Sequence, residues 1–179
     1  MLPFILIALA VLVVIFIAVV AARPSDFTIT RKIAISALPA EVFTHVNDLH
    51  LWQEWSPWAK KDPNSVITYS GPGAGKDASF HWAGNKEVGE GRMTIAESHA
   101  SNSVKIRLDF EKPFRANHLA LFTFTSEGAS TVVTWSMSGQ NNFLFKAVGM
   151  FLNVDKMVGQ DFEKGLASLK AIVETGETK

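Results

Sequence analysis

The chain has 179 residues, with 17 basic and 17 acidic side chains and a formal net charge of zero. Its charge is balanced and no run of five like charges occurs, which argues against the clustered Lys and Arg that drive nucleic-acid binding. The absence of cysteine removes disulfides, thiolate nucleophiles and cysteine-ligated zinc sites. The length suits one folded domain with an appendage.

The appendage is the apolar stretch at the N-terminus. From Leu2 to Ala22 no side chain is charged and nearly all are aliphatic or Phe, and about twenty such residues span a bilayer as a helix. A cleaved signal peptide is the alternative, which the small residues Ala21 and Ala22 permit. The run exceeds the roughly 7–15 apolar residues usual there, and no basic segment precedes it. We therefore expect an uncleaved, single-pass transmembrane anchor.

Positive residues after the span indicate its orientation. Arg23, Arg31 and Lys32 follow it, whereas only the α-amino group precedes it. Because Lys and Arg favour the cytoplasmic side of a span, we predict a cytoplasmic domain. The linker at residues 23–26 reaches about 13 Å when extended, so the domain is expected close to the membrane.

Alternating polarity after the linker predicts an antiparallel sheet. Within residues 102–112, apolar side chains at even positions from 104 to 110 alternate with charged ones at odd positions from 105 to 111, a pattern typical of a strand with one buried and one wet face. The first strand alternates in the same way, with Arg31 as the exception on its apolar face. The predicted strands are residues 27–36, 65–71, 78–84, 87–97, 102–112, 116–128 and 129–140.

Helical patterns flank this sheet in the sequence. Two short helices are predicted over residues 36–48 and 49–55, the second ended by Pro57. After Asn142, apolar residues recur at three- and four-residue steps, which predicts one amphipathic helix to about Glu174, roughly 45 Å long. The helix would cover the apolar face of the sheet, so the fold class is α+β. A curved sheet around one long helix leaves space for a cavity.

A series of short motifs occurs in order along this domain. The motifs are PAEVF (39–43), WQEWSPW (52–58), GP with a later Gly (71–75), GEGRM (89–93), KPF (112–114), TVVTW (131–135) and GLASLK (165–170). Together with the strand pattern they resemble the START-like or SRPBCC superfamily, in particular its polyketide cyclase/dehydrase-like branch.

The resemblance implies a helix-grip fold, a curved antiparallel sheet around a long C-terminal helix, here preceded by one transmembrane helix. It does not imply one activity, because the superfamily includes lipid and hormone carriers, cyclases and oxygenase domains. The expected organisation is an anchor at 1–22, a linker at 23–26, the START-like domain at 27–174 and a tail at 175–179.

Three of the five tryptophans lie close together, at Trp52, Trp55 and Trp58. In the helix-grip arrangement we expect Trp55 and Trp58 to pack between the short helices and the sheet, and Trp52 to lie nearer the cavity lip. Plain core packing without ligand contact is the alternative. Gly159 and Gly165 would either bring helix and sheet together or leave room for a ligand. The candidate ligand-binding residues, chosen largely by strand phase, are Trp52, Trp55, Trp58, Phe80, Trp82, Met93, Leu108, Phe110, Phe122, Phe124, Trp135 and Phe151.

Catalytic and metal-binding motifs are largely missing from the sequence. No H-x-H, H-E-x-x-H or G-x-S-x-G pattern occurs, so neither a metal site nor a serine nucleophile is expected. GPGAGK (71–76) has too short a spacing for a phosphate-binding loop and is followed by Asp77. His118 and Arg92 are the candidates for acid–base chemistry. Their structural alternatives are a surface histidine and an outward ion pair of Arg92 with Glu90.

The sequence favours a membrane-tethered module that binds a small hydrophobic ligand, lipid or polyketide-like, without a cofactor and without nucleic acid. One alternative is an enzyme of the cyclase or aromatase type that acts through His118 or Arg92. Another is a protein-recruiting domain with a filled core. A cavity on the order of a few hundred Å³ would argue against the filled core.

Overall fold

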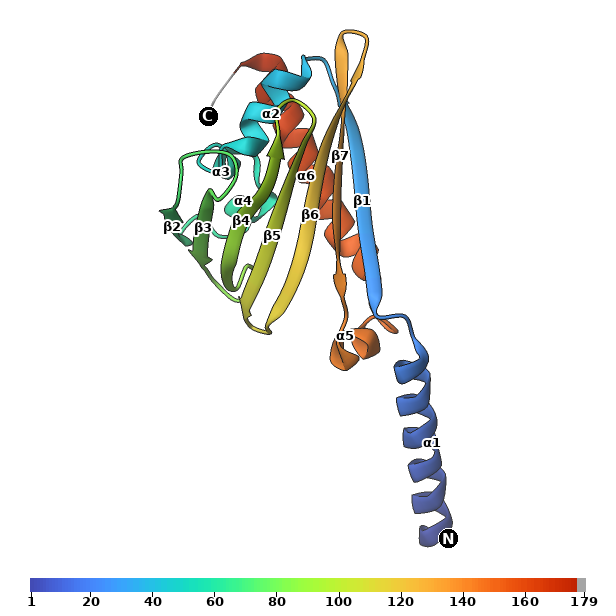
Figure 1. The fold of residues 1–179 in the computed structure, drawn as a ribbon. Coiled ribbons are helices and arrows are strands. Elements are labelled where there is room, and N and C mark those ends of the chain that lie inside the picture. The colour runs from blue at the N-terminus through green and yellow to red at the C-terminus, as the bar shows by residue number, and fades with distance from the viewer. Residues whose placement is uncertain (177–179) are drawn as a thin grey trace.

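Helix α1 (Leu2–Ala22) stands apart from the rest of the chain (Figure 1). The computed structural model describes residues 1–176, and within that range α1 is the one helix long and apolar enough to cross a membrane. Its 21 residues correspond to about 31 Å, close to the roughly 30 Å of a bilayer's hydrocarbon core. An N-terminal signal sequence forms a similar helix.

Seven antiparallel strands form one curved sheet in the order β1-β7-β6-β5-β4-β3-β2. Their bounds are β1 Asp26–Ile35, β2 Val66–Ser70, β3 Ser79–Ala83, β4 Glu90–His99, β5 Ser103–Lys112, β6 Ala116–Glu127 and β7 Ser130–Gln140. Each predicted strand is present, and the predicted α+β helix-grip architecture is confirmed. Irregular register in β4, at Glu90/Gly91 and Ile95/Glu97, interrupts its pairing with β5, and such irregularities bend a sheet.

Three short helices follow β1 and pack against the C-terminal helix: α2 (Pro39–Asn47), α3 (Trp52–Trp55) and α4 (Pro57–Lys61). Pro39 occupies the first turn of α2, and the Glu41 carboxylate accepts a hydrogen bond from the backbone N–H of Leu38 at 3.0 Å. As predicted, the helix that contains Trp52 and Trp55 ends before Pro57, but the further helix α4 was not predicted from the sequence. Proline fits the first turn of a helix, and Pro57 begins α4.

The C-terminal helix is interrupted, unlike the predicted continuous helix after Asn142. Helix α5 (Phe143–Val148) and helix α6 (Val154–Thr175) are separated by residues 149–153. Asn142 and Asn153 each cap a new helix, because their side-chain oxygens accept backbone N–H groups at 2.9 Å. Helix α6 ends at Gly176 in the left-handed conformation, and residues 177–179 of the predicted tail lie outside the described residues.

A solid core fills the half of the sheet–helix space that is farther from α1. At this end of β1 and α6, Ile35, Trp55, Phe122 and Leu169 have no exposed surface. Gly165 lets α6 approach the sheet closely, because a Cβ there would lie 3.0 Å from Trp135 Cζ3. Of the two roles considered for Gly165, close packing is the one observed.

Candidate ligand-binding cavity

A cavity of about 450 Å³ occupies the other half of this space, on the side nearer α1. Its walls come from the inner face of the sheet, the short helices α3 and α4, and the first turns of α6. The volume falls within the roughly 300–1,000 Å³ typical of sites for small molecules. The filled core expected of a purely protein-recruiting domain is therefore not observed.

The walls are mainly apolar and rich in aromatic rings. They include Phe27, Ile29, Trp52, Trp58, Ile67, Phe80, Trp82, Met93, Leu108, Phe110, Ala120, Trp135, Met137, Val158 and Phe162. A few polar side chains interrupt them, among them Thr28, Gln53, Ser65, Glu87, His118 and Asp155. An arrangement of this kind buries an apolar molecule and leaves few groups to orient its polar end.

Many of the predicted ligand-binding residues lie on the cavity wall. Those in the wall are Trp52, Trp58, Phe80, Trp82, Met93, Leu108, Phe110 and Trp135. Trp55, Phe122 and Phe124 are instead buried in the solid core, because they lie farther along the sheet–helix space. Phe151 is 78 % exposed, because the helix is interrupted at that point. Contact with a ligand stays a prediction for every residue in the wall.

The tryptophans are arranged differently from the prediction that placed Trp52 nearest the lip. Trp52 is only 2 % exposed, and its ring lies 4.3 Å from that of Trp55. The Trp55 indole N–H donates to the backbone oxygen of His45 at 3.0 Å, which fixes α3 against α2. Trp58 is only partly buried, because Pro57 starts α4 and turns it away from the α3 pair.

His118 lies on the inner face of β6 and lines the cavity, unlike the surface histidine considered as an alternative. Its ring is 5.0 Å from that of Phe27 and 5.3 Å from that of Phe110. Gly139 provides the space for it, because a Cβ there would collide with the imidazole Cδ2. Nδ1 is buried without a hydrogen-bond partner among the described residues. Burial lowers the pKa of His118, which favours the neutral imidazole.

Arg92 does not line the cavity. It lies on the outer face of β4, where Nη1 donates to Ser70 Oγ at 3.3 Å. Glu90 shares that face, but its ion-pair partner is Lys112 and not Arg92, and this pairing lowers the pKa of the Glu90 carboxyl. His118 is therefore the only one of the two predicted acid–base candidates in the cavity.

Within the described part of the chain, one group of side chains has atoms close enough to hold a metal ion: His81, Glu90 and Glu111 on the outer face of the sheet. Lys112 already pairs with Glu90. An ammonium group at this carboxylate competes with a cation for the same oxygens.

Arg31 clamps α6 beside the cavity, a role that the strand pattern did not reveal. Its Nε donates to Glu163 Oε1 at 2.8 Å, and Nη2 donates to Asp155 Oδ2 at 3.0 Å. The two carboxylates raise the pKa of Arg31. Gly159 is needed for this clamp, because a Cβ there would overlap Nη2. Gly159 therefore makes room for the arginine and not for a ligand.

A curved antiparallel sheet that encloses an apolar cavity against a long C-terminal helix defines the helix-grip class. Residues 26–174 match the family model described as "Polyketide cyclase / dehydrase and lipid transport", and the chain belongs to this family. No curated protein sequence matches the chain.

Solved structures share the fold at low sequence identity. TTHA0849 from Thermus thermophilus has a TM-score of 0.62 and 16 % identity, covering 84 % of this chain and 99 % of that one. The Aha1 dimer from Colwellia psychrerythraea gives 0.60 and 15 %, covering 84 % and 98 %. The di-domain ARO/CYC StfQ of the steffimycin biosynthetic pathway gives 0.59 and 10 %, covering 84 % and 51 %. At these identities the likeness is one of fold.

Proposed function

We propose that this chain is a membrane-tethered module that binds a small hydrophobic molecule, a lipid or a polyketide-like compound, in the cavity. The observation that supports this is the cavity of about 450 Å³ with mainly apolar and aromatic walls. Empty apolar space is costly in a folded core, so a cavity of this size is better explained by an occupant than by packing. The family's description includes both lipid transport and polyketide cyclases.

The tether is the second part of the proposal. Helix α1 has the length and composition of a membrane span, and β1 begins at Asp26, four residues after α1 ends. The half of the domain that contains the cavity is therefore held beside the bilayer, into which apolar ligands partition. Arg23 directly follows the span, and with Arg31 and Lys32 it favours a cytoplasmic location of the domain.

The ligand is tested on the full chain, extracted from membranes in lipid nanodiscs and analysed by native mass spectrometry. We expect the wild type to retain a defined small molecule, and Ala120→Phe to lose it, because Ala120 lies in the cavity wall and is 2 % exposed. Leu121→Phe is the matched control, because its side chain points to the outer face and is 39 % exposed. A wild type that binds nothing from a panel of fatty acids, phospholipids and polycyclic aromatics would contradict the proposal.

The tether and its orientation are tested on the same chain in its native membrane. An uncleaved anchor resists extraction by alkaline carbonate, and the mature protein still contains residues 1–22. A soluble product that begins near Arg23 would identify α1 as a signal sequence. A C-terminal tag is then digested in sealed vesicles of known sidedness, and protection of the tag in vesicles with the cytoplasmic face inside supports the cytoplasmic domain.

His118 favours a second candidate function, an enzyme of the cyclase or aromatase type. A neutral imidazole in an apolar cavity is suited to remove a proton from carbon next to a carbonyl group. The test compares cyclisation of a linear poly-β-ketone thioester by the wild type and by His118→Phe. Equal products and rates in the two proteins would exclude this role for His118.

A further inference from the structure

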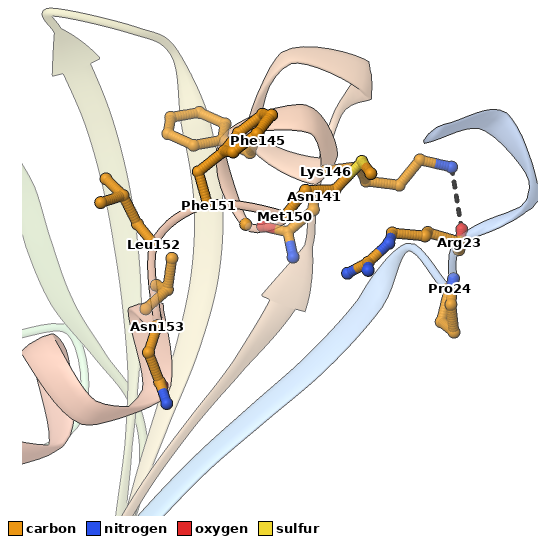
Figure 2. Close-up of a pocket in the computed structure, with 11 residues that line it drawn as sticks. Arg23, Pro24, Asn141, Phe145, Lys146, Met150, Phe151, Leu152 and Asn153 are labelled. Atoms are coloured by element: carbon orange, nitrogen blue, oxygen red, sulfur yellow. Dashed lines mark hydrogen bonds between the residues drawn. The ribbon is translucent and has the colours of Figure 1, made fainter. Parts of the chain in front are cut away.

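A second hollow lies where α1 joins the domain (Figure 2). It has a volume of about 480 Å³ and is lined by the linker residues Arg23 and Pro24, by α5, and by residues 149–154. Asn141, Phe145 and Val154 line both this hollow and the apolar cavity. The two spaces therefore adjoin, with Phe145 and Val154 between them.

The lining of this hollow is positively charged. It contains Arg23 and Lys146 and no acidic residue. Lys146 Nζ donates to the backbone oxygen of Arg23 at 2.9 Å (Figure 2) and to that of Ala21 at 3.0 Å, which holds α5 against the end of α1. The guanidinium of Arg23 has no hydrogen bond or ion pair within the described residues. A free guanidinium presents planar donors that match the oxygens of a phosphate group.

Exposed apolar side chains lie on α5, in residues 151–152 of the hollow's lining and at Phe114, whose ring is 5.8 Å from that of Phe145, and we call them the apolar rim. They are Phe114, Phe143, Leu144, Val148, Phe151 and Leu152. Phe151 is 78 % exposed and the others are between 36 % and 50 % exposed. Exposed large apolar residues near cations are typical of a surface that enters a membrane interface.

The length of α1 sets the depth of these groups. Its 21 residues span about the full hydrocarbon thickness of a bilayer, so Arg23 follows at the level of the phosphate groups. Lys146 bonds to the same end of α1 and places α5 at this level. The part of the apolar rim on α5 and the following segment is therefore at the boundary between the phosphate groups and the acyl chains.

We propose that this hollow binds the phosphate headgroup of an anionic phospholipid of the membrane in which α1 is inserted. Arg23 and Lys146 contact the phosphate, and the apolar rim contacts the acyl region. Because Phe145 and Val154 also border the cavity, a lipid held here lies at its entrance. The inference rests on the membrane tether of the proposed function and is independent of which molecule the cavity holds.

The experiment uses the full chain in nanodiscs with equimolar phosphatidylglycerol and phosphatidylcholine of identical acyl chains. After release in a mass spectrometer, the ratio of the two lipids is measured among proteins that retain one lipid. Two basic residues near a membrane surface predict a preference of roughly tenfold or more for the anionic lipid. Arg23→Gln with Lys146→Gln should remove most of this preference.

The matched control is Lys32→Gln with Lys164→Gln, which removes the same charge from exposed positions outside the hollow. It should retain the preference. Arg23→Gln alone guards against misfolding, because this side chain has no bond to lose within the described residues, and it should lower the ratio severalfold. Equal ratios in the two double variants would overturn the proposal. Displacement of the lipid by equimolar glycerol 3-phosphate would also overturn it, because the site would then select a soluble anion.

Ala120→Phe separates this inference from the proposed cavity function. It fills the cavity and leaves Arg23 and Lys146 unchanged, so the preference for phosphatidylglycerol should persist. An empty wild-type cavity together with an Arg23-dependent lipid preference would contradict the cavity function and support the headgroup site. A bound cavity ligand without that preference would support the cavity function and contradict the headgroup site.

Discussion

Replacing Trp52 with Ala should destabilise the domain more than replacing Trp58 with Ala. Trp52 is 2 % exposed, and its ring lies 5.5 Å from that of Phe122 and 6.1 Å from that of Trp135. Removal of a buried tryptophan costs about 3–5 kcal/mol, because transfer energy is lost and a new void remains. At roughly 2–4 °C for each kcal/mol in a domain of this size, Trp52→Ala should lower Tm by about 6–20 °C.

Trp58 should be less costly because it is only partly buried, whereas Trp52, which also lines the cavity, is 2 % exposed. Its ring contacts those of Trp135 at 5.8 Å and Phe162 at 6.3 Å. We expect a cost of about 1–2 kcal/mol from the lost apolar burial, which corresponds to about 2–8 °C in Tm.

The two variants are compared in one assay, thermal unfolding of the full chain in nanodiscs followed by near-UV circular dichroism. Leu121→Ala is the surface control, since Leu121 is 39 % exposed on the outer face of β6, and it should change Tm little. The decisive quantity is the ratio of the two Tm shifts, because both variants share the same unfolding entropy. A shift for Trp58→Ala as large as that for Trp52→Ala would refute this distinction between a fully buried and a partly buried tryptophan.

Three further substitutions test other parts of the structure. Gly159→Ala should lower Tm because its Cβ displaces Arg31, whereas Gly73→Ala, where the added Cβ meets nothing within 4 Å, should not. Burial lowers the pKa of His118, so the unfolded chain binds more protons between that lowered pKa and about 6.5, and stability rises with pH through this window. His118→Phe should flatten this rise in a Tm series between about pH 5 and 8. Thr131→Val should cost about 1–3 kcal/mol in urea unfolding, because the Thr131 hydroxyl has no exposed surface and donates to a backbone oxygen at 2.7 Å, which is left unpaired.

The strands were predictable from the sequence because the sheet has one wet face and one buried face. In β5, Val104 and Ile106 have no exposed surface while Arg107 is exposed, as the alternation of apolar and charged residues predicts. The same phase placed His118 on the inner face of β6. It did not separate core from cavity wall, because Phe122 and His118 share one face and differ only in their distance along the strand.

Contacts between distant segments were not predictable in this way. Arg31 interrupts the apolar face of β1, and its partners Asp155 and Glu163 lie 124 and 132 residues away. A strand pattern records only which face a residue occupies. It does not record that a glycine on α6 leaves room for a guanidinium on that face.

The interruption of the C-terminal helix was missed because the apolar period continues through it. Val148, Phe151 and Val154 are spaced like the face of one helix, yet Phe151 is 78 % exposed. Gly149 and Asn153 are the local signals, since glycine weakens a helix and asparagine favours a helix start. The sequence alone does not show how deeply a residue is buried, so an apolar residue on the surface fits the same pattern as one in the core. An apolar surface residue beside a bilayer contacts lipid, whereas a core residue contacts other side chains.

The interruption between α5 and α6 lies where the apolar cavity adjoins the hollow at the end of α1. A helix continued back from Val154 to Phe143 would extend roughly 17 Å further along the sheet, over the end of the cavity nearest α1. The chain instead begins α6 at Val154 and places α5 beside the end of α1, through the hydrogen bonds of Lys146 to Ala21 and Arg23. Phe145 of α5 therefore borders both the cavity and the hollow at the end of α1. The same interruption thus lies where the apolar cavity and the hollow at the end of α1 share their lining.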